Sequence, residues 1–382
     1  MKAMLPLLVR LAGPSLAAAL ALVLQAAPPA GPAAAAAAAT GPPAPPAPPA
    51  PAAVPPSPAV APPAAALIQP MRARVPAFGE TLSLEVRDLP RAAADDALRA
   101  AAAEIGEVER LTDPDRPGGD LAALNAAAGK GPQRVDPRLF ATLVRALNFC
   151  LWSDGKEGPL ARDLHRLWGR GAAAPQAAPP PPELVERAVA AAACNHLRLD
   201  QRQPSAALDA GSALDLVDFS AGLAIDRAVE VLRQHGATNA FVQLRDLRRG
   251  IGAGRDGRGW EIDLPAMGGL LEPLGRIFLR DQSLAIATRD DRPLSVGGQL
   301  LRHFVNQRSG QPAGEGIWAT LTITELAIDA QALAATMTIT GTQEGEMLTG
   351  SIRPRPSILW LMGSGSGVPV LVEYRWTEVP KR

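Results

Sequence analysis

The chain has 382 residues, and its 38 basic and 38 acidic side chains give a formal net charge of zero. This balance argues against nucleic acid as a partner, because proteins that bind nucleic acid present a basic surface to the phosphates. Aromatic residues make up only 4% of the sequence and include a single tyrosine, Tyr374, so stacking surfaces for ring-shaped ligands must be few.

Residues 1–26 have the features of a secretory signal peptide. Lys2 and Arg10 precede an apolar run from Leu11 to Leu24, and small residues follow it. The run is short and rich in alanine for a membrane span, although an uncleaved N-terminal anchor is the alternative. No cysteine lies near the expected cleavage region, which excludes a lipoprotein anchor. We therefore expect the body of the protein to be exported, with a membrane tether through this segment as the alternative.

Residues 27–67 consist almost entirely of alanine and proline, as in GPPAPPAPPAPAAVPPSPAV. Such a segment buries no core, and its prolines favour an extended polyproline form. We interpret it as a disordered linker that acts as a spacer. The remaining residues, 68–382, are enough for one large domain with its own hydrophobic core.

Periodicity and turn residues predict the elements of this domain in chain order. Between the predicted helices, LTDPDRPGGDLAALN looks like a surface loop and Ala173–Pro182 is of low complexity. We expect strands and helices at these positions: a strand in Pro76–Leu89, helices in Arg91–Arg110, Pro137–Trp152 and Glu183–Ala193, and strands in Ala240–Leu244, Ser357–Met362 and Val368–Val379.

The most informative stretch is Leu214–Asp226, which reads LDLVDFSAGLAID. Leu214 and Leu216 alternate with polar residues as at the end of a strand, and an amphipathic helix follows and ends at Gly236. Asp218 and Ser220 are both suitable N-cap residues for that helix. A helix that begins directly after a strand exposes backbone N–H groups that attract anions, although many such units bind nothing.

Cys150 and Cys194 are the only two thiols of the chain. An exported location permits a disulfide, yet cysteines on separate predicted helices are more often independent buried thiols, and we expect the latter. Neither the cysteines nor the four histidines have the spacing of a metal site.

The central stretch resembles a motif of the ApbE family, the periplasmic FAD:protein FMN transferases. The family motif reads leucine-aspartate-leucine-glycine-glycine-x-alanine-lysine-glycine and ends in aspartate. Here some positions match and some differ: Asp215, Leu216, Gly222 and Asp226 match, Val217 and Asp218 replace the paired glycines, and Ala221 replaces the lysine.

Further segments resemble family motifs in the same order along the chain. Several have lost residues of the pattern; Arg289 and Asp290, for example, stand where the family has serine and glycine. The matching segments are Phe78–Glu80, Asn125, Gly155–Pro159, Trp168–Gly169, Leu244–Asp246, Ala287–Asp290 and His303–Pro312.

The segment Ala327–Gly341 resembles the family's metal-binding pattern, in which an aspartate and a threonine reach one magnesium ion from the same helix face. Gln331 and Ala335 stand at those two positions in this chain. An amide and a methyl group are poor ligands for magnesium, so metal binding is doubtful here. Asp329 and Thr336 lie nearby but on other faces of the predicted helix.

The resemblance implies an α+β domain with antiparallel sheets flanked by helices. It implies FAD as substrate or ligand, transfer of FMN to a threonine or serine of an exported flavoprotein or redox partner, and a periplasmic location. Because the metal-ligand and lysine positions differ, we expect weakened or lost catalysis. The alternative is a non-catalytic flavin-binding or accessory protein. The candidate residues are Asp226 and Asp329 for catalysis, and Phe78, Asn125, Ser220, Gly222, Asp246, Thr288, Arg289 and His303 for flavin binding.

Overall fold

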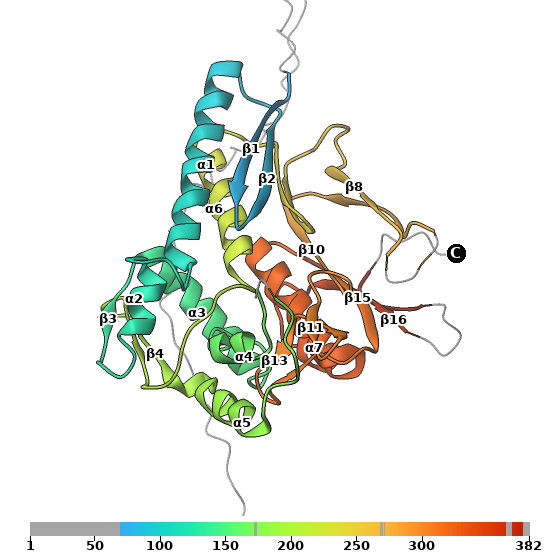
Figure 1. Cartoon of the computed structure of the whole chain (residues 1–382). Coiled ribbons are helices and arrows are strands. Elements are labelled where there is room, and N and C mark those ends of the chain that lie inside the picture. The colour runs from blue at the N-terminus through green and yellow to red at the C-terminus, as the bar shows by residue number, and fades with distance from the viewer. Residues whose placement is uncertain (1–68, 172–173, 268–269, 271, 364–368, 377–382) are drawn as a thin grey trace, which may run out of the picture. The chain divides into compact units, whose positions relative to one another are not determined.

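The computed structural model describes residues 69–171, 174–267, 270, 272–363 and 369–376 (Figure 1). All of them belong to one compact unit, Pro63–Arg382. The predicted signal peptide and the predicted linker lie outside the described residues. Within the described ranges, no helix has both the length and the apolar character that crossing a membrane requires.

A central antiparallel sheet organises the described domain. Its strands follow the order β1-β2-β6-β7-β10-β15-β16-β17, so the chain leaves the sheet and returns to it several times. The bounds of these strands are β1 (Met71–Ala77), β2 (Glu80–Val86), β6 (Ala240–Leu244), β7 (Leu247–Ile251), β10 (Gln282–Thr288), β15 (Ile317–Thr324), β16 (Ser357–Met362) and β17 (Val370–Tyr374).

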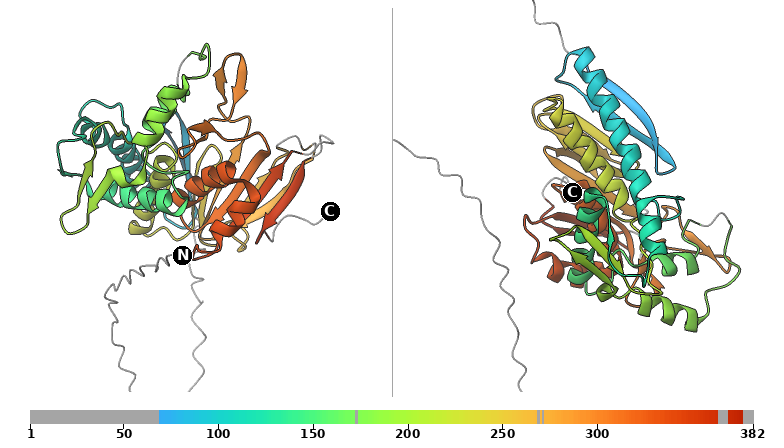
Figure 2. Two further views of the ribbon diagram at one scale, coloured as in Figure 1. Left: turned by 90° about the horizontal axis from the view of Figure 1, so that it is seen from below. Right: turned by 90° about the vertical axis from the view of Figure 1, so that its left-hand side faces the viewer.

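Each face of this sheet packs against a different layer, because side chains alternate along a strand. On β10, Ala285 and Ala287 belong to the core beneath the helices α1 (Arg91–Thr112), α6 (Ser220–Gln234) and α7 (Ala327–Thr349). Leu284 and Ile286 face the hairpin of β8 (Trp260–Leu264) and β9 (Gly275–Leu279). Figure 2 shows α1 and α6 running side by side. The sheet is therefore covered by helices on one face and by a hairpin on the other.

A second hydrophobic core joins the shorter elements to the start of α6 and to α7. It includes Leu143, Leu164 and Leu208 together with Leu216 and Phe219. The elements around it are α2 (Asp120–Ala126), α3 (Pro137–Trp152), α4 (Arg162–Leu167), α5 (Pro182–Ala191) and the three-stranded sheet β3 (Gln133–Arg134), β5 (Ser205–Leu208) and β4 (Leu197–Asp200). Two small hairpins complete the described chain, β11 (Leu294–Val296) with β12 (Gln299–Leu301) and β13 (Val305–Asn306) with β14 (Gln311–Pro312).

The fold class expected from the sequence is confirmed, and most predicted elements occur where they were expected. Three local predictions were wrong. The predicted surface loop before Asn125 contains the helix α2. The residues Leu214–Leu216 form no strand in this structure, because the backbone of Leu214 pairs with the side chain of Asn125. The residue before α6 is Phe219, without a side-chain cap, since Asp218 is engaged by an arginine elsewhere.

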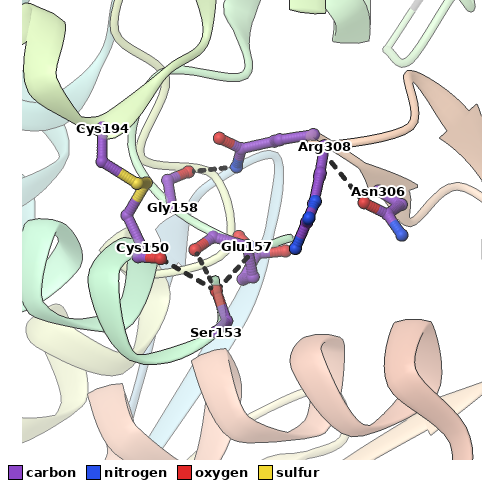
Figure 3. The surroundings of a disulfide bond; sticks show 8 residues. Cys150, Ser153, Glu157, Gly158, Cys194, Asn306 and Arg308 are labelled. Atoms are coloured by element: carbon purple, nitrogen blue, oxygen red, sulfur yellow. Dashed lines mark hydrogen bonds between the residues drawn. A yellow bond between two sulfur atoms is a disulfide. The ribbon is translucent and has the colours of Figure 1, made fainter. Parts of the chain in front are cut away.

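The expectation of two independent thiols was also wrong, because Cys150 and Cys194 form a disulfide with a Cα–Cα distance of 5.9 Å (Figure 3). Cys194 does not continue α5, which ends at Ala191; it begins a short 3-10 turn that approaches the end of α3. Gly158 lies against this bond, and a Cβ there would lie only 2.6 Å from Cys150 Cβ. The loop after α3 thus passes directly over the disulfide.

Candidate functional site

A cavity of about 810 Å³ opens among the described residues where the helical layer meets the sheet. Two tight turns form part of its wall. Phe78 and Gly79 join β1 to β2 with φ angles of 52° and 71°, and Arg245 and Asp246 join β6 to β7. The turns are neighbours because β2 pairs with β6, and Arg245 forms an ion pair of 2.6 Å with Glu80. The opposite wall includes Asp218, Ser220, His303 and Phe304.

Five residues singled out from the sequence line this cavity: Phe78, Ser220, Asp246, His303 and Gln331. They come from elements that are far apart in the chain and that the fold brings together. The backbone N–H of Phe78 donates to Glu109 Oε1 at 2.8 Å, which fixes the first turn against α1. The other candidates, Asn125, Gly222, Asp226, Thr288, Arg289, Asp329 and Ala335, lie outside the cavity lining.

Asn125 and Gly222 contribute to the cavity indirectly. The Asn125 side chain donates to the carbonyl of Leu214 at 3.0 Å and accepts from its N–H at 2.7 Å, so it holds the segment that leads to α6. Gly222 is the point where α6 and α7 touch, since a Cβ there would lie 2.4 Å from Ile328 Cα. Both residues position the segment that carries Ser220.

Thr288 ends β10, and Arg289 follows it. The Arg289 guanidinium lies over the ring of Trp318, 4.5 Å from the ring centroid. This stacking is a favourable use of an arginine side chain. It directs Arg289 to the tryptophan rather than to the cavity.

Asp226 is buried and holds the start of α7. Its carboxylate accepts hydrogen bonds from the backbone N–H groups of Ala327 at 2.8 Å and Ile328 at 3.0 Å, and it forms an ion pair with Arg249. The N-cap residue of α7, Leu326, has no polar side chain to do this. Burial raises the pKa of Asp226, while Arg249 and the two N–H groups oppose that shift. The geometry is that of a helix cap supplied from a neighbouring helix.

Asp329 lies in the first turn of α7 and forms a two-pronged ion pair with Arg145 of α3. The pair ties α3 to α7. Neither Asp329 nor Arg145 faces the main cavity.

The donor set at the two positions of the family's metal ligands does not fit a magnesium ion. The Gln331 side chain accepts from Gly222 N–H at 2.7 Å and donates to the carbonyl of Val217 at 2.9 Å, so both ends of its amide are occupied. Ala335 is fully buried, and its methyl side chain has no atom that could coordinate a metal ion. Among the described residues, no group of three or more His, Cys, Asp or Glu side chains is arranged to hold a metal ion.

A buried ionic network at the cavity wall was not found from the sequence. Arg170 donates from its two terminal nitrogens to the two oxygens of Asp218, each at 2.6 Å. Arg170 Nη1 also lies 3.0 Å from His165 Nε2, and His165 Nδ1 lies 2.9 Å from Asp215 Oδ2. These contacts assign the imidazole proton to Nδ1, which donates to Asp215. The one signal in the sequence was the charged Asp218 at a position where the family has glycine.

The network shifts the pKa values of its members in opposite directions. Burial alone would raise the pKa of Asp218, but Arg170 outweighs burial and the pKa lies well below its usual value. Glu157 is buried close by, and burial, followed by the charge of Asp218, raises its pKa well above 4.5. Burial and Arg170 lower the pKa of His303 to about 4, so His303 is neutral at neutral pH. Its Nδ1 donates to the carbonyl of Asp291 at 2.7 Å.

Apolar surface predominates in the cavity lining, and the charged side chains in it are unevenly balanced. Seven carboxylate side chains and three arginines line it among the described residues: Glu80, Glu109, Asp113, Asp215, Asp218, Asp246 and Asp291, with Arg170, Arg245 and Arg292. Most of these charged side chains would repel an anionic group in the cavity. The arginines are the side chains of the lining that would attract it.

This fold and cavity define an α+β domain with a cleft large enough for a nucleotide-sized ligand. The model of the ApbE family matches residues 78–358, nearly the whole described domain. The chain belongs to the ApbE family, and the resemblance drawn from its motifs is confirmed.

Two curated relatives carry the name FAD:protein FMN transferase. That of Treponema pallidum (strain Nichols) is 26% identical over 273 residues, which cover 66% of this chain and 73% of the relative. That of Rhodobacter capsulatus is 23% identical over 299 residues, which cover 76% of this chain but only 55% of the relative.

Solved structures share the fold at lower identity. The apo form of the flavinyl transferase ApbE of Pseudomonas stutzeri superposes with a TM-score of 0.70 at 19% identity, covering 80% of this chain and 95% of that one. The flavin transferase ApbE of Vibrio cholerae gives a TM-score of 0.70 at 18% identity, with 80% and 96% covered.

Proposed function

We propose that this chain binds FAD in the 810 Å³ cavity and that its flavin transfer activity is weakened or lost. The observation that carries the proposal is the convergence of Phe78, Ser220, Asp246 and His303 on one cleft. Each of these residues was assigned to the flavin from a different motif. A cavity of this size is within the range of ligand sites that enclose most of a small molecule.

The cleft offers distinct environments for the parts of such a ligand. Phe78, Phe304 and the aliphatic side chains of Leu247 and Ile286 supply apolar surface for a ring system. Ser220 lies at the N-terminus of α6, where backbone N–H groups and the helix dipole favour an anionic group. In the neutral His303 the proton is on Nδ1, which donates to the backbone carbonyl of Asp291. Nε2 is therefore left as a hydrogen-bond acceptor.

We infer weakened transfer from the residues that stand at the positions of the family's two metal ligands and its lysine. Breaking a phosphoanhydride requires positive charge close to the phosphoryl oxygens, and losing one such stabilising group typically costs about 3–4 kcal/mol in an active site. Gln331, Ala335 and Ala221 are uncharged at the positions where the family motifs have two metal ligands and a lysine. We place neither Asp226 nor Asp329 in a catalytic role, since their contacts with Arg249 and Arg145 serve the packing of α7.

A working FMN transferase is the second candidate, because both curated relatives carry that name. In that reaction a hydroxyl oxygen of the acceptor would bond to the FMN phosphorus, the anhydride bond would break, and AMP would leave. In either case we propose an exported, periplasmic chain that acts with an exported flavoprotein or redox partner, with residues 1–26 as the export signal or tether.

Titration of the full chain with FAD, followed by flavin fluorescence, tests the binding. We expect saturable binding that is weakened about tenfold or more by His303→Ala, which corresponds to about 1.4 kcal/mol. His235→Ala, an exposed histidine at the end of α6, is the matched control and should leave the affinity unchanged. The absence of saturable binding would refute the proposal.

Chromatography of the same mixtures separates the two candidates. Bound FAD that stays intact supports a binding protein with lost catalysis. Stoichiometric or catalytic release of AMP would establish the transferase or a related pyrophosphatase instead.

A further inference from the structure

We propose that this chain binds its flavin nucleotide without a divalent metal ion. In this proposal Gln331 provides the crosslink that shapes the cleft, and Arg170 provides its fixed positive charge. The inference rests on the proposed function, because it concerns how FAD is held in the same cavity.

The first observation is the position of the Gln331 amide. It joins α7 to both sides of the turn that begins α6, with Oε1 at 2.7 Å from Gly222 N and Nε2 at 2.9 Å from the carbonyl of Val217. These two contacts fix the orientation of the amide, because exchanging its oxygen and nitrogen would oppose donor to donor and acceptor to acceptor. One lone pair of Oε1 is used by the Gly222 N–H, so a neutral amide oxygen with a single remaining lone pair is all that Gln331 could offer a cation. The cleft wall is therefore already crosslinked by the protein itself.

The second observation is steric. One turn before Gln331, the two helices meet backbone to backbone, since a Cβ on Gly222 would lie 2.4 Å from Ile328 Cα and 2.6 Å from the carbonyl oxygen of Ala327. Ala335, one turn beyond Gln331, presents only a buried methyl group. At neither of these two places is there room for a magnesium ion, which keeps several water ligands.

The third observation is the state of Arg170. Its side chain is only 10% exposed, yet it lines the cavity. Three of its five N–H groups are used by Asp218 and His165, and its guanidinium carbon lies 5.9 Å from the centre of the Phe304 ring. Among the described residues no partner is found for the Nε–H and the second Nη2–H, so these two donors can serve a ligand. The guanidinium is held in one orientation before any ligand arrives.

An arginine of this kind can bind a phosphate through its remaining N–H donors, while Asp218 balances its charge before a ligand binds. It stays protonated over the whole usable pH range and binds phosphate oxygens with two parallel hydrogen bonds. Its ion pair with Asp218 orients it, and the second carboxylate of the network, Asp215, is engaged by His165. We therefore assign the phosphate contact of FAD to Arg170. Ala221, which also lines the cavity, supplies no charge.

The test uses the full chain in two buffers, one with millimolar magnesium and one with EDTA. Isothermal titration should give FAD affinities that agree within about twofold, well under the tenfold change that corresponds to about 1.4 kcal/mol. A second arm titrates manganese alone against the protein without FAD and follows it by electron paramagnetic resonance. We expect no stoichiometric manganese site. An affinity at least about tenfold weaker in EDTA, or one manganese site that disappears in Gln331→Ala, would overturn the inference.

The variants test the two residues separately. Gln331→Ala should weaken FAD binding by about tenfold in both buffers, whereas the exposed Gln299→Ala on β12 should not change it. Arg170→Lys keeps the positive charge but loses the planar guanidinium that binds phosphate through two N–H groups. It should therefore weaken FAD binding and leave manganese binding absent. Unchanged FAD affinity in both Gln331→Ala and Arg170→Lys would contradict the assignment. Circular dichroism checks that each variant is folded. If a variant does not fold, the comparison of wild-type FAD affinity in magnesium and in EDTA still decides the inference.

The outcomes also separate this inference from the function on which it rests. Tight FAD binding that requires magnesium refutes the inference and leaves the proposed function standing. If FAD binds in neither buffer, the proposed function fails, and the manganese arm alone decides whether the cleft holds a metal.

Discussion

Glu157 is a carboxylic acid in a place that disfavours its charge. It is only 3% exposed, and burial together with Asp218 raises its pKa well above the usual 4.5. A raised pKa means that its contribution to stability is fully present below pH 4.5 and is lost as the pH rises through the folded value. A glutamine at position 157 does not ionise, so Glu157→Gln avoids the loss of stability that ionisation of the buried carboxyl causes. The variant should thus be more stable than wild type at neutral pH.

Urea unfolding of both proteins at a series of pH values, from about pH 4 to pH 8, measures this effect. The stability difference should grow as the pH rises and vanish in acid. A difference that is constant with pH would show that Glu157 is not responsible.

Gly222 is required by the approach of two helices. A Cβ there would overlap the backbone of Ile328, so Gly222→Ala should cost about 1–3 kcal/mol in unfolding free energy. A Cβ on Gly106 in α1 would meet open space, with no neighbouring atom within 4 Å, and Gly106→Ala should be neutral or stabilise by up to about 1 kcal/mol. Denaturant unfolding of the pair measures both. Equal effects of the two substitutions would contradict the packing.

Residue roles were the least predictable part of the site. The resemblance singled out Asp226 as a matching motif position and Asp329 as a nearby substitute, but it does not reveal that Arg249 and Arg145 engage them. Partners 23 and 184 positions away depend on the complete fold. Phe78 and His303 were singled out because they lie in segments that resemble family motifs, and both residues do line the cleft.

At the scale of elements, the start of α3 depends on a single cap. Asp136 accepts from the N–H of Arg138 at 2.8 Å, with Pro137 at the first helical position. Asp136→Ala should destabilise the protein by about 1 kcal/mol, whereas Asp136→Asn keeps an acceptor and should cost less. The control Asp95→Ala, on the exposed face of α1, should have little effect. Unfolding curves in urea measure all three.

The pH dependence of this cap has a defined sign. The hydrogen bonds from Arg138 lower the pKa of Asp136, so its charged form contributes stability above pH 3.8 that is lost as the pH falls through the lower folded value. The difference between wild type and Asp136→Asn should shrink in acid. A difference that widens there would contradict this assignment.

The disulfide closes a loop of 44 residues that contains α4, α5 and the loop over Gly158. Chain entropy predicts about 4 kcal/mol of stabilisation for a loop of 44 residues. A reductant should thus lower the urea midpoint of the wild type and leave that of a Cys150→Ala/Cys194→Ala double variant unchanged. If the urea midpoint of the wild type does not change with the reductant, the Cys150–Cys194 disulfide is contradicted.

Elements were predictable to the extent that their signals were local. The helices α3 and α6 were predictable from their apolar periodicity, from Pro137 at the start of α3 and from Gly236 after the end of α6. The disulfide did not follow, because it depends on where the chain turns after α5. The segment Leu214–Leu216 has the alternation of a strand, but Asn125 takes the backbone hydrogen bonds of Leu214, and the Asp215 N–H donates to the carbonyl of Pro159.

For the whole molecule, the family and the fold class were accessible from the sequence because partial motifs occur in the correct order. The order in which strands pair was not, since β2 pairs with β6 across more than 150 residues of chain. That pairing places the turns of Phe78 and Asp246 beside each other, and the cleft depends on it. The site is thus a property of the sheet topology as much as of the motifs.

Ligand binding should also stabilise the molecule as a unit. FAD at a hundredfold excess over its dissociation constant should add about 2.7 kcal/mol to the unfolding free energy, because it binds only the folded chain. Thermal unfolding with and without FAD measures this. His303→Ala should reduce the shift, and His235→Ala should retain it.

Hydrogen–deuterium exchange of the full chain, with and without FAD, tests the central claim most directly, because it reports where the nucleotide lies. The account predicts slower exchange at the Phe78 turn, at the start of α6, at the Asp246 turn and around His303, with no change in the β8–β9 hairpin. Protection confined to that hairpin, or no protection anywhere, would contradict flavin binding in this cleft.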